Sequence, residues 1–155
     1  MNEINTPPEL LLDNQLCFTI YACSREITKL YQPYLDRLGV TYSQYLVLLV
    51  LWEKNQCTVK ELGEALYLDS GTLTPLLKRL QAAGIILRER STEDERKVLI
   101  SLTEQGLALQ EQAKVIPGMM MEGTGMEAEE FQALLGQFKD LLHRVHEANT
   151  GGMRK

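Results

Sequence analysis

The stretch that decides the fold of this chain is Asp69-Ser70-Gly71-Thr72-Leu73-Thr74-Pro75-Leu76-Leu77-Lys78-Arg79-Leu80. Its spacing predicts a helix. The residues before it, from 58 on, predict a shorter helix and a tight turn, and those after it, up to 102, predict two short strands joined by a charged loop. That order is typical of a winged helix-turn-helix, in which one helix braces, the next lies in a DNA major groove, and a hairpin reaches the neighbouring backbone or minor groove.

Helix-capping signals support this order. Thr58 and Glu61 can form a capping box, in which the Thr58 hydroxyl accepts from the Glu61 amide and the Glu61 carboxylate accepts from the Thr58 amide. Either Asp69 or Ser70 can cap the second helix. Each helix carries an apolar stripe at helical spacing, made of Leu62, Ala65 and Leu66 in the first and of Leu73, Leu76, Leu77 and Leu80 in the second.

The polar residues of the second helix are left for its outer surface. Small hydroxyls near a helix N-terminus, followed by cations a turn or two later, suit contacts to base edges and phosphates. For this helix taken alone, an ordinary capped helix with a solvated face is an equally good interpretation. Because Pro75 is comfortable only in a first helical turn, the helix either begins near residues 71–72 or bends there. The residues expected to contact DNA are Asp69, Ser70, Gly71, Thr72, Thr74, Pro75, Lys78 and Arg79.

The hairpin that follows is the predicted wing. Gly84 is expected to end the helix, and residues 86–90 and 97–102 are expected to form the two strands. The segment 91–96 between them is too polar to be buried. Arg96 can enter a minor groove while Asp94 holds its guanidinium in a bidentate pair. The wing adds Arg88, Arg90, Asp94 and Arg96 to the expected DNA-binding residues.

At this point the sequence resembles a known family. Residues 58–106, with the Asp94-Glu95-Arg96 wing and the following Leu102-Thr103-Glu104-Gln105-Gly106, are similar to the MarR family of dimeric winged-helix repressors. The resemblance implies a mainly α fold with a small β-hairpin wing (α+β). It also implies one MarR-like chain over 1–155, in which 41–102 is the DNA-binding region and the helices of 9–38 and 104–148 form an intertwined dimer interface.

Composition agrees with one domain but does not decide the partner. The chain has 155 residues, 45% of them hydrophobic, which is enough for one good core. Its formal net charge is −5, yet residues 58–97 hold seven basic and seven acidic side chains and are neutral. An acidic body behind a neutral reading surface would limit non-specific binding to DNA. Net charge therefore neither excludes nor supports a DNA partner.

Several classes of protein are not indicated. No run of about 18 apolar residues is present, so we expect no membrane span, and the N-terminus lacks the pattern of a secretory signal. Three cysteines at irregular spacing do not make a disulfide framework and fit a reducing cytoplasm. No metal-ligand spacing exists, so we expect no metal and no cofactor. His143 and His146 are expected on the surface of the last helix.

Apolar helices are predicted at both ends of the chain. Residues 1–8 are expected to be a loose arm, and 9–31 a helix that is apolar nearly all round until Pro33 kinks or ends it. A second apolar helix is expected over 44–53, with Trp52 in the core.

After the wing, Thr103 is expected to cap a helix running to about Ile116, with a break at Pro117-Gly118. A last helix over 128–147 carries an apolar heptad pattern, and 149–155 is expected to be disordered. Burying both ends against a second copy would give a two-fold dimer that reads a pseudo-palindromic DNA site.

A closer resemblance covers about residues 10–118. It rests on Asn14-Gln15-Leu16-Cys17-Phe18, Tyr21-Ala22-Cys23-Ser24-Arg25-Glu26, Tyr31, Thr41-Tyr42 and the run from Tyr67 to Pro75. These are similar to the organic-hydroperoxide-sensing branch of MarR regulators, usually called OhrR. In that branch one N-terminal cysteine is the peroxide sensor, which falls on Cys17. Two tyrosines that donate hydrogen bonds to it across the dimer interface fall on Tyr31 and Tyr42.

The chemistry implied for Cys17 is physically sound. A thiolate attacks peroxide, and phenolic O–H donors stabilise that anion. Oxidation gives a sulfenic acid, which a small cellular thiol can cap. Cys23 lies six residues on, a helical rise of about 9 Å that exceeds what a disulfide tolerates, and Cys57 is expected to be incidental. We therefore expect one-cysteine chemistry.

Other interpretations stay open. From periodicity alone, Cys17 is a small buried hydrophobe. In that case the chain would be a MarR-type repressor released by a small aromatic or lipophilic ligand. A thiol peroxidase, in which Cys17 turns over, is a more distant alternative. A histidine–cysteine hydrolase is weaker still, because both histidines lie far from Cys17 in sequence with no oxyanion motif near it. The sequence thus predicts a regulator and not an enzyme.

Overall fold

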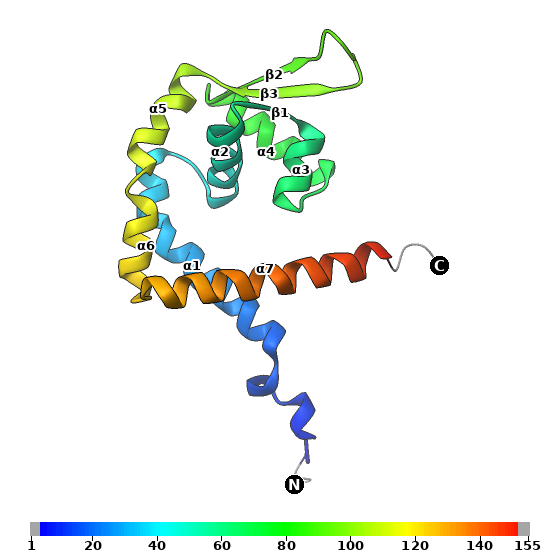
Figure 1. The fold of residues 1–155 in the computed structure, drawn as a ribbon, viewed down its shortest axis with the longest axis vertical. Coiled ribbons are helices and arrows are strands. Elements are labelled where there is room, and N and C mark those ends of the chain that lie inside the picture. Colours follow the sequence, from blue (N-terminus) through cyan, green and yellow to red (C-terminus); the bar gives the residue numbers. More distant parts are fainter. Residues whose placement is uncertain (1–3, 152–155) are drawn as a thin grey trace. The chain divides into compact units, whose positions relative to one another are not determined.

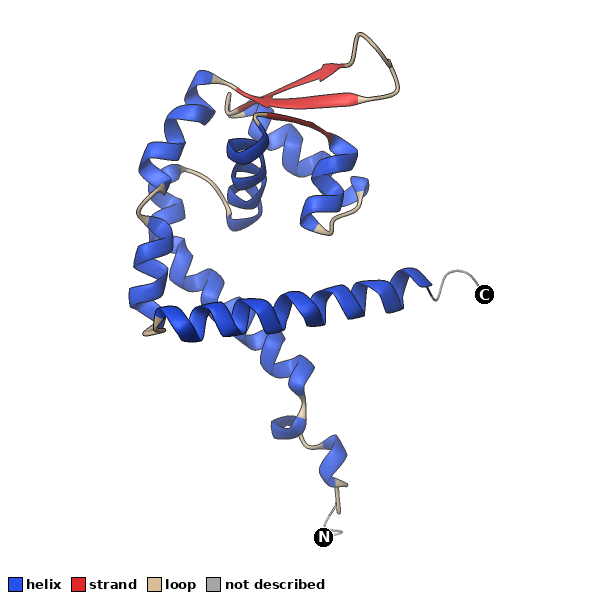
Figure 2. Ribbon diagram, viewed as in Figure 1, coloured by secondary structure: helices blue, strands red, loops and turns tan. Residues whose placement is uncertain are grey.

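The structure is a computed structural model that describes residues 4–151. The chain divides into two compact units, Met1–Ile116 and Pro117–Lys155. The described elements, drawn in Figures 1 and 2, are two short 3-10 turns (Pro8–Leu10 and Leu12–Asn14), α1 (Leu16–Leu38), α2 (Tyr42–Lys54), β1 (Gln56–Thr58), α3 (Val59–Leu66), α4 (Ser70–Ala82), β2 (Ile86–Arg90), β3 (Val98–Leu102), α5 (Glu104–Ala113), α6 (Ile116–Thr124) and α7 (Ala128–Gly151).

The winged-helix region has the predicted order of elements. Helices α2, α3 and α4 lie on one side of a small antiparallel sheet (Figure 1). The strand order is β1-β3-β2, with Ile86 opposite Leu102 and Arg90 opposite Val98. The predicted hairpin is therefore confirmed, but the third strand, β1, was not predicted. The mainly α fold with a small β wing is the one expected.

The capping signals act as the sequence indicates. Thr58 and Glu61 form the predicted capping box of α3, and Thr41 and Gln44 form a second one at the start of α2. The predicted stripe of α4 is buried in full: Leu73, Leu76, Leu77 and Leu80. Of the stripe predicted for α3 only Leu62 is buried, whereas Leu66 is half-buried and Ala65 is exposed.

Gly39 and Gly84 hold backbone conformations that other residues rarely adopt. Gly39 has φ of 71° at the end of α1, and Gly84 has φ of 75° after α4. Both permit the left-handed turn that ends a helix. The helix end at Gly84 is the one expected there.

The first long helix differs from the prediction. It begins at Leu16, not at residue 9, since the preceding residues form two 3-10 turns held by Asn14 and Gln15 side chains that donate to backbone carbonyls of Pro8 and Glu9. Pro33 does not end the helix. Pro33 and Lys29 are exposed, so water can bond the carbonyl that the missing amide leaves unpaired.

The predicted break at Pro117-Gly118 is also wrong. Thr103 caps α5 as expected, but α5 ends at Ala113 and α6 begins at Ile116. Pro117 therefore lies in the first turn of α6. Amides there have no acceptor within the helix, so a proline at this position costs no hydrogen bond.

In the second unit, α7 is longer than the predicted 128–147. Residues 149–151, expected to be disordered, belong to α7, and the remainder of that tail and residues 1–3 of the arm lie outside the described residues. Along one stripe of α7, large apolar side chains are exposed: Phe131, Leu135, Phe138, Leu142 and Val145. His143 and His146 are on the helix surface as expected, and the His143 Nε2 lies 3.3 Å from a carboxylate oxygen of Glu147.

Residues 4–151 contain neither a helix that could span a membrane nor a cluster that could bind a metal ion. No described helix is both long and apolar enough to cross a membrane. No group of three or more histidine, cysteine or acidic side chains in that part of the chain could hold a metal ion.

Candidate functional site

The N-terminus of α4 is organised by Asp69. Its carboxylate accepts a hydrogen bond from the Thr72 amide at 2.7 Å, so Asp69, and not Ser70, caps the helix. That bond also lowers the pKa of Asp69. The Thr74 hydroxyl donates to the Ser70 carbonyl at 2.7 Å, so Thr74 is occupied within the helix too. The helix begins at Ser70, one residue before the start near 71–72 that was one of the two expectations for Pro75.

Most of the predicted DNA-contacting residues of α4 face solvent. Three of them act on the helix itself: Asp69 caps it, Thr74 bonds within it, and Pro75 has no amide hydrogen to donate. Thr74 is the one that is only half exposed. The others present hydroxyls, backbone or cations to the outside: Ser70, Gly71, Thr72, Lys78 and Arg79.

The wing tip holds Arg96 in place. The Arg96 Nε and one terminal nitrogen lie 3.1 and 3.4 Å from the two carboxylate oxygens of Asp94, which is the predicted bidentate pair. The Arg96 side chain is 91% exposed, whereas the Asp94 side chain is 30% exposed. The Asp94 carboxylate also accepts a hydrogen bond from the Arg96 backbone amide. The nearby guanidinium lowers the pKa of Asp94. The arginine is thus presented to solvent in one orientation without being buried.

Arg90 has a structural task that the sequence did not indicate. One of its terminal nitrogens donates to the Glu95 carbonyl across the loop at 3.4 Å. The Ser91 hydroxyl accepts from the amides of Glu93 and Asp94, which closes the loop from the other side. Arg90 therefore braces the wing tip in the structure.

A cleft with a net positive lining lies between α3, α4, β2 and β3: four of its side chains are cations, and two, Glu61 and Glu64, are carboxylates. Its volume is about 530 Å³. It brings together Arg88, Arg96 and Thr74 of the predicted set, and adds Lys60 and Lys97, which the sequence analysis missed. The Arg88 Nε is buried and has no hydrogen-bond partner among the described residues. The cleft is therefore suited to an anionic group such as a phosphate.

Cys17 lies in the first turn of α1, with its residue exposed. Its apolar neighbours Leu16 and Phe18 are 64% and 40% exposed. Tyr31 follows fourteen residues later on the same helix, a rise of about 21 Å. Cys17 and Tyr31 of one chain therefore cannot touch.

The two predicted tyrosines do meet each other. The ring centroids of Tyr31 on α1 and Tyr42 on α2 are 5.0 Å apart. Tyr45 completes the cluster, with its ring 5.8 Å from Tyr31 and 6.3 Å from Tyr42. Sequence reasoning missed Tyr45, although its position three residues after Tyr42 on one helix face could have revealed it.

Burial keeps these phenols protonated. It raises the pKa of Tyr31 to about 12, with the neighbouring phenols adding to the shift, and it raises the pKa of Tyr42 and of Tyr45. A phenol that holds its proton at neutral pH is a hydrogen-bond donor. The cluster can therefore donate to an anion brought to it from outside this chain.

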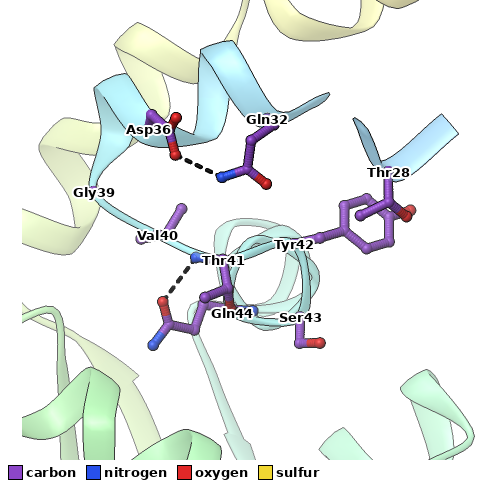
Figure 3. Close-up of a pocket in the computed structure, with 9 residues that line it drawn as sticks. All are labelled: Thr28, Gln32, Asp36, Gly39, Val40, Thr41, Tyr42, Ser43 and Gln44. Carbon is purple, nitrogen blue, oxygen red and sulfur yellow. Dashed lines mark hydrogen bonds between the residues drawn. The ribbon is translucent and has the colours of Figure 1, made fainter. Parts of the chain in front are cut away.

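Tyr42 is reachable from one side. It lines an open pocket of about 700 Å³ between the end of α1 and the start of α2 (Figure 3). Apart from Gly39 and Val40, the rest of the lining is polar: Gln32 donates to Asp36 at 2.6 Å, and the Thr41 amide donates to Gln44 at 2.9 Å. Its position lets another molecule approach the Tyr42 side of the cluster.

The other two cysteines differ from Cys17. Cys23 is exposed on α1. Cys57 is 3% exposed, on β1 opposite Ile100, so it is a core residue. Burial raises the pKa of Cys57 and keeps its thiol protonated.

Comparison with known proteins places the chain among regulators. The family model described as transcriptional regulator SarA/Rot matches residues 29–112. The chain is 54% identical, over 138 residues, to an organic hydroperoxide resistance transcriptional regulator of Bacillus subtilis (strain 168), covering 89% of this chain and 94% of the relative.

Solved structures agree. AbfR of Staphylococcus epidermidis, overoxidised and bound to DNA, matches with a TM-score of 0.71 and 39% identity, over 86% of this chain and 94% of that one. A mutant of MarR from E. coli, complexed with operator DNA, matches with a TM-score of 0.74 and 29% identity, over 82% of this chain and 93% of that one.

Proposed function

Since the chain belongs to the MarR family of winged-helix transcriptional regulators, in its organic hydroperoxide-resistance branch, we propose that it is a dimeric repressor. It binds operator DNA and releases it when an organic hydroperoxide oxidises Cys17. It acts in the cytoplasm on double-stranded, pseudo-palindromic DNA.

The separation of Cys17 from the phenols is the observation that carries the sensing half. A thiol on the first turn of α1 and a cluster of protonated donors about 21 Å farther along cannot serve each other within one chain. In a two-fold dimer, Cys17 of each protomer reaches the Tyr31 and Tyr42 of its partner, and two equal sensor sites result. Neither site is complete in a single chain.

The exposed apolar side chains support a second copy as the covering partner. Leu16, Phe18 and the N-terminal leucines 10–12 are exposed on the first unit, and α7 carries an exposed apolar stripe of its own. Surface of this kind is costly in water. We propose that residues 9–38 and 104–148 bury it between protomers, leaving 41–102 to read DNA.

The reading half rests on two prepared elements. The exposed polar face of α4 can lie in a major groove, and Arg96, held by Asp94, can enter the adjacent minor groove. Lys60, Arg88 and Lys97, which line the cleft beside α4, suit a backbone phosphate. DNA-bound AbfR and MarR support the same use of this fold.

The chemistry at Cys17 is a two-electron oxidation. The thiolate sulfur attacks the distal peroxide oxygen, the O–O bond breaks, and the leaving alkoxide takes a proton, giving a sulfenic acid and an alcohol. A low-molecular-weight thiol then attacks the sulfenic sulfur, giving a mixed disulfide and water. Neither Cys23, on the same helix, nor the buried Cys57 is placed to resolve it within the chain.

Release follows from the size and polarity of the product. A sulfenic acid or a thiol adduct does not fit an apolar interface that held a thiolate, so the protomers repack there. Repacking changes the distance between the two recognition helices, and the fixed spacing of successive grooves is lost. On this proposal Cys17 reacts once for each release, in contrast to the many turnovers of a peroxidase.

The test is a gel shift on DNA upstream of the protein's own gene, with and without cumene hydroperoxide. We expect the peroxide to release the wild type and the Cys23→Ser control, whereas Cys17→Ser stays bound. Release of Cys17→Ser by peroxide would contradict the proposal, and its release by a lipophilic ligand alone would favour a ligand-controlled repressor. Many equivalents of peroxide consumed per Cys17, with thiol supplied, would favour a peroxidase.

A further inference from the structure

We infer that Tyr45 is a positioning residue for the sensor phenols and that Tyr45 and Trp52 together couple those phenols to the junction of recognition helix and wing. The inference rests on the function proposed above. It adds a route between the two halves of that function, made of residues that neither bind DNA nor touch the reacting sulfur.

Tyr45 is the buried member of the phenol cluster. It is 3% exposed, whereas Tyr31 and Tyr42 are half-buried. Its ring lies within 6.3 Å of both of the other phenol rings. A buried ring in contact with both donors limits where each can move. Tyr45 thereby sets the spacing of the pair without reaching the thiol.

Trp52 continues the contact along α2. Its ring meets Tyr45 edge-on, with centroids 6.3 Å apart and planes at 69°. Tyr45 and Trp52 are seven residues apart, which is two helical turns, so both lie on one face of α2. The Trp52 indole N–H donates to the Gly106 carbonyl in α5 at 3.0 Å. This is a bond between residues far apart in sequence, and it fixes α2 against α5.

Gly106 lies where the DNA-reading elements join. A Cβ at this position would come within 2.3 Å of the Ile85 carbonyl oxygen, so α5 begins in direct contact with the turn between α4 and β2. The Thr103 hydroxyl donates to the Gly84 carbonyl at 2.6 Å and caps α5 through the Gly106 amide. One junction therefore holds the end of the recognition helix, the start of the wing and the start of α5.

The contacts thus form a continuous path within the first unit, from Tyr31 and Tyr42 through Tyr45 and Trp52 to Gly106 and Ile85. Closely packed side chains pass on a displacement instead of absorbing it. A change at the phenols when Cys17 is oxidised would then shift α5 against the base of the wing. Contacts like these also occur in ordinary core packing. What distinguishes the route is a measurable coupling between the oxidation of Cys17 and operator binding that depends on these residues.

The first arm of the test compares Tyr45→Phe with Tyr45→Leu, measuring the rate at which cumene hydroperoxide removes the free thiol of Cys17. Phenylalanine keeps the ring, so we expect a rate within about twofold of wild type. Leucine removes the aromatic contacts, and we expect the rate to fall about two- to tenfold. A wild-type rate for Tyr45→Leu, with unchanged thermal unfolding, would overturn the positioning role.

The second arm uses Trp52→Phe, which keeps the ring edge and loses the bond to Gly106. We expect Cys17 to oxidise at the wild-type rate, while the factor by which oxidation weakens operator binding falls about fivefold, the size of one lost hydrogen bond. Full release of the oxidised variant would overturn the coupling. Trp52 is the chain's single tryptophan, so we also expect its fluorescence to change on oxidation of the wild type, and a constant signal would count against the route.

Two kinds of failure are distinguishable. If wild-type protein is not oxidised at Cys17 or keeps its operator afterwards, the proposed function fails and takes this inference with it. If the wild type responds, and Tyr45→Leu and Trp52→Phe respond as the wild type does, the proposed function stands and only the Tyr45–Trp52 route is wrong.

Discussion

The DNA-reading region and the sensor region of this chain differ in how much of each is complete in one copy. In the reading region the caps, the sheet and the Asp94–Arg96 pair are all formed within the chain. In the sensor region Cys17 and Tyr31 lie about 21 Å apart along α1, Tyr42 packs against Tyr31 from α2, and large apolar side chains face solvent. The DNA-reading region, here called the reader, is complete within one chain. The sensor region, here called the sensor, needs a second chain to complete its site.

This difference predicts which changes affect which half. A reader built within one chain should keep its DNA affinity when the sensor is disabled. A sensor shared between protomers should keep its chemistry when the reader is disabled. The substitutions below test that independence, from the largest expected effect to the smallest.

Cys17→Ser should give the largest effect. We expect release by organic hydroperoxide to be lost altogether, because on the proposed function Cys17 is the thiol that meets the partner's phenols, and Cys57 is buried. Operator affinity of the untreated protein should stay within about twofold of wild type, since the reader is unchanged. Titration of labelled operator, with and without cumene hydroperoxide, measures both. A large loss of affinity before any peroxide is added would mean that the two halves are not separate.

Arg96→Ala should damage the reader alone. Removing the oriented guanidinium should cost about 1–3 kcal/mol of operator binding. The rate of Cys17 oxidation should not change. Asp94→Asn is the matched variant, since it keeps the size of the partner and weakens its hold on Arg96, and we expect a smaller loss. Equal losses from the two substitutions would show that orientation, and not charge, is what Arg96 supplies.

Gly106→Ala tests the junction between the halves. Its Cβ would meet the Ile85 carbonyl oxygen, so the backbone must shift, and we expect a loss of roughly 1–3 kcal/mol in the free energy of unfolding. Gly136→Ala is the control: this α7 position, opposite the apolar stripe, has no atom within 4 Å of an added Cβ. There the higher helix propensity of alanine should stabilise by up to about 1 kcal/mol. Thermal unfolding of both variants checks the signs.

The smallest effect concerns pH. Because burial raises the pKa of Tyr31 to about 12 from 10.0, the folded protein keeps this proton at a pH where the unfolded chain loses it. Tyr31 therefore lowers stability as pH rises from 10 towards 12, and has no such effect below pH 10. Because burial also raises the pKa of Tyr42 and of Tyr45, a spectrophotometric titration of phenol ionisation should show several late-titrating groups in the wild type and one fewer in Tyr31→Phe. An unchanged number of late-titrating groups in that variant would contradict the shift at Tyr31.

The parts of the fold that depend on local chemistry could be read from the sequence. The Thr58–Glu61 capping box, the leucine stripe of α4, the left-handed turn at Gly84 and the Asp94–Arg96 pair all rest on neighbours a few residues apart. Each has a fixed spacing and a specific partner, so sequence alone was sufficient for them.

The features that were missed depend on distant partners or on solvent. Strand β1 has three residues and exists because β3 pairs with it. Pro33 was expected to kink or end α1, but it faces water and the helix continues past it. Pro117 was expected to mark a break, but it lies in the first turn of α6. The Trp52–Gly106 bond became visible only once α2 and α5 were brought together.

A mixed dimer tests the shared sensor most directly. One protomer carries Cys17→Ser, and its partner carries Tyr31→Phe and Tyr42→Phe but keeps Cys17. If the phenols act across the interface, this dimer has one complete site, and we predict that its single Cys17 is oxidised by cumene hydroperoxide at the wild-type rate, although the Tyr31→Phe, Tyr42→Phe homodimer reacts slowly. A mixed dimer as slow as that homodimer would show that the phenols serve their own chain's thiol, and would contradict the account.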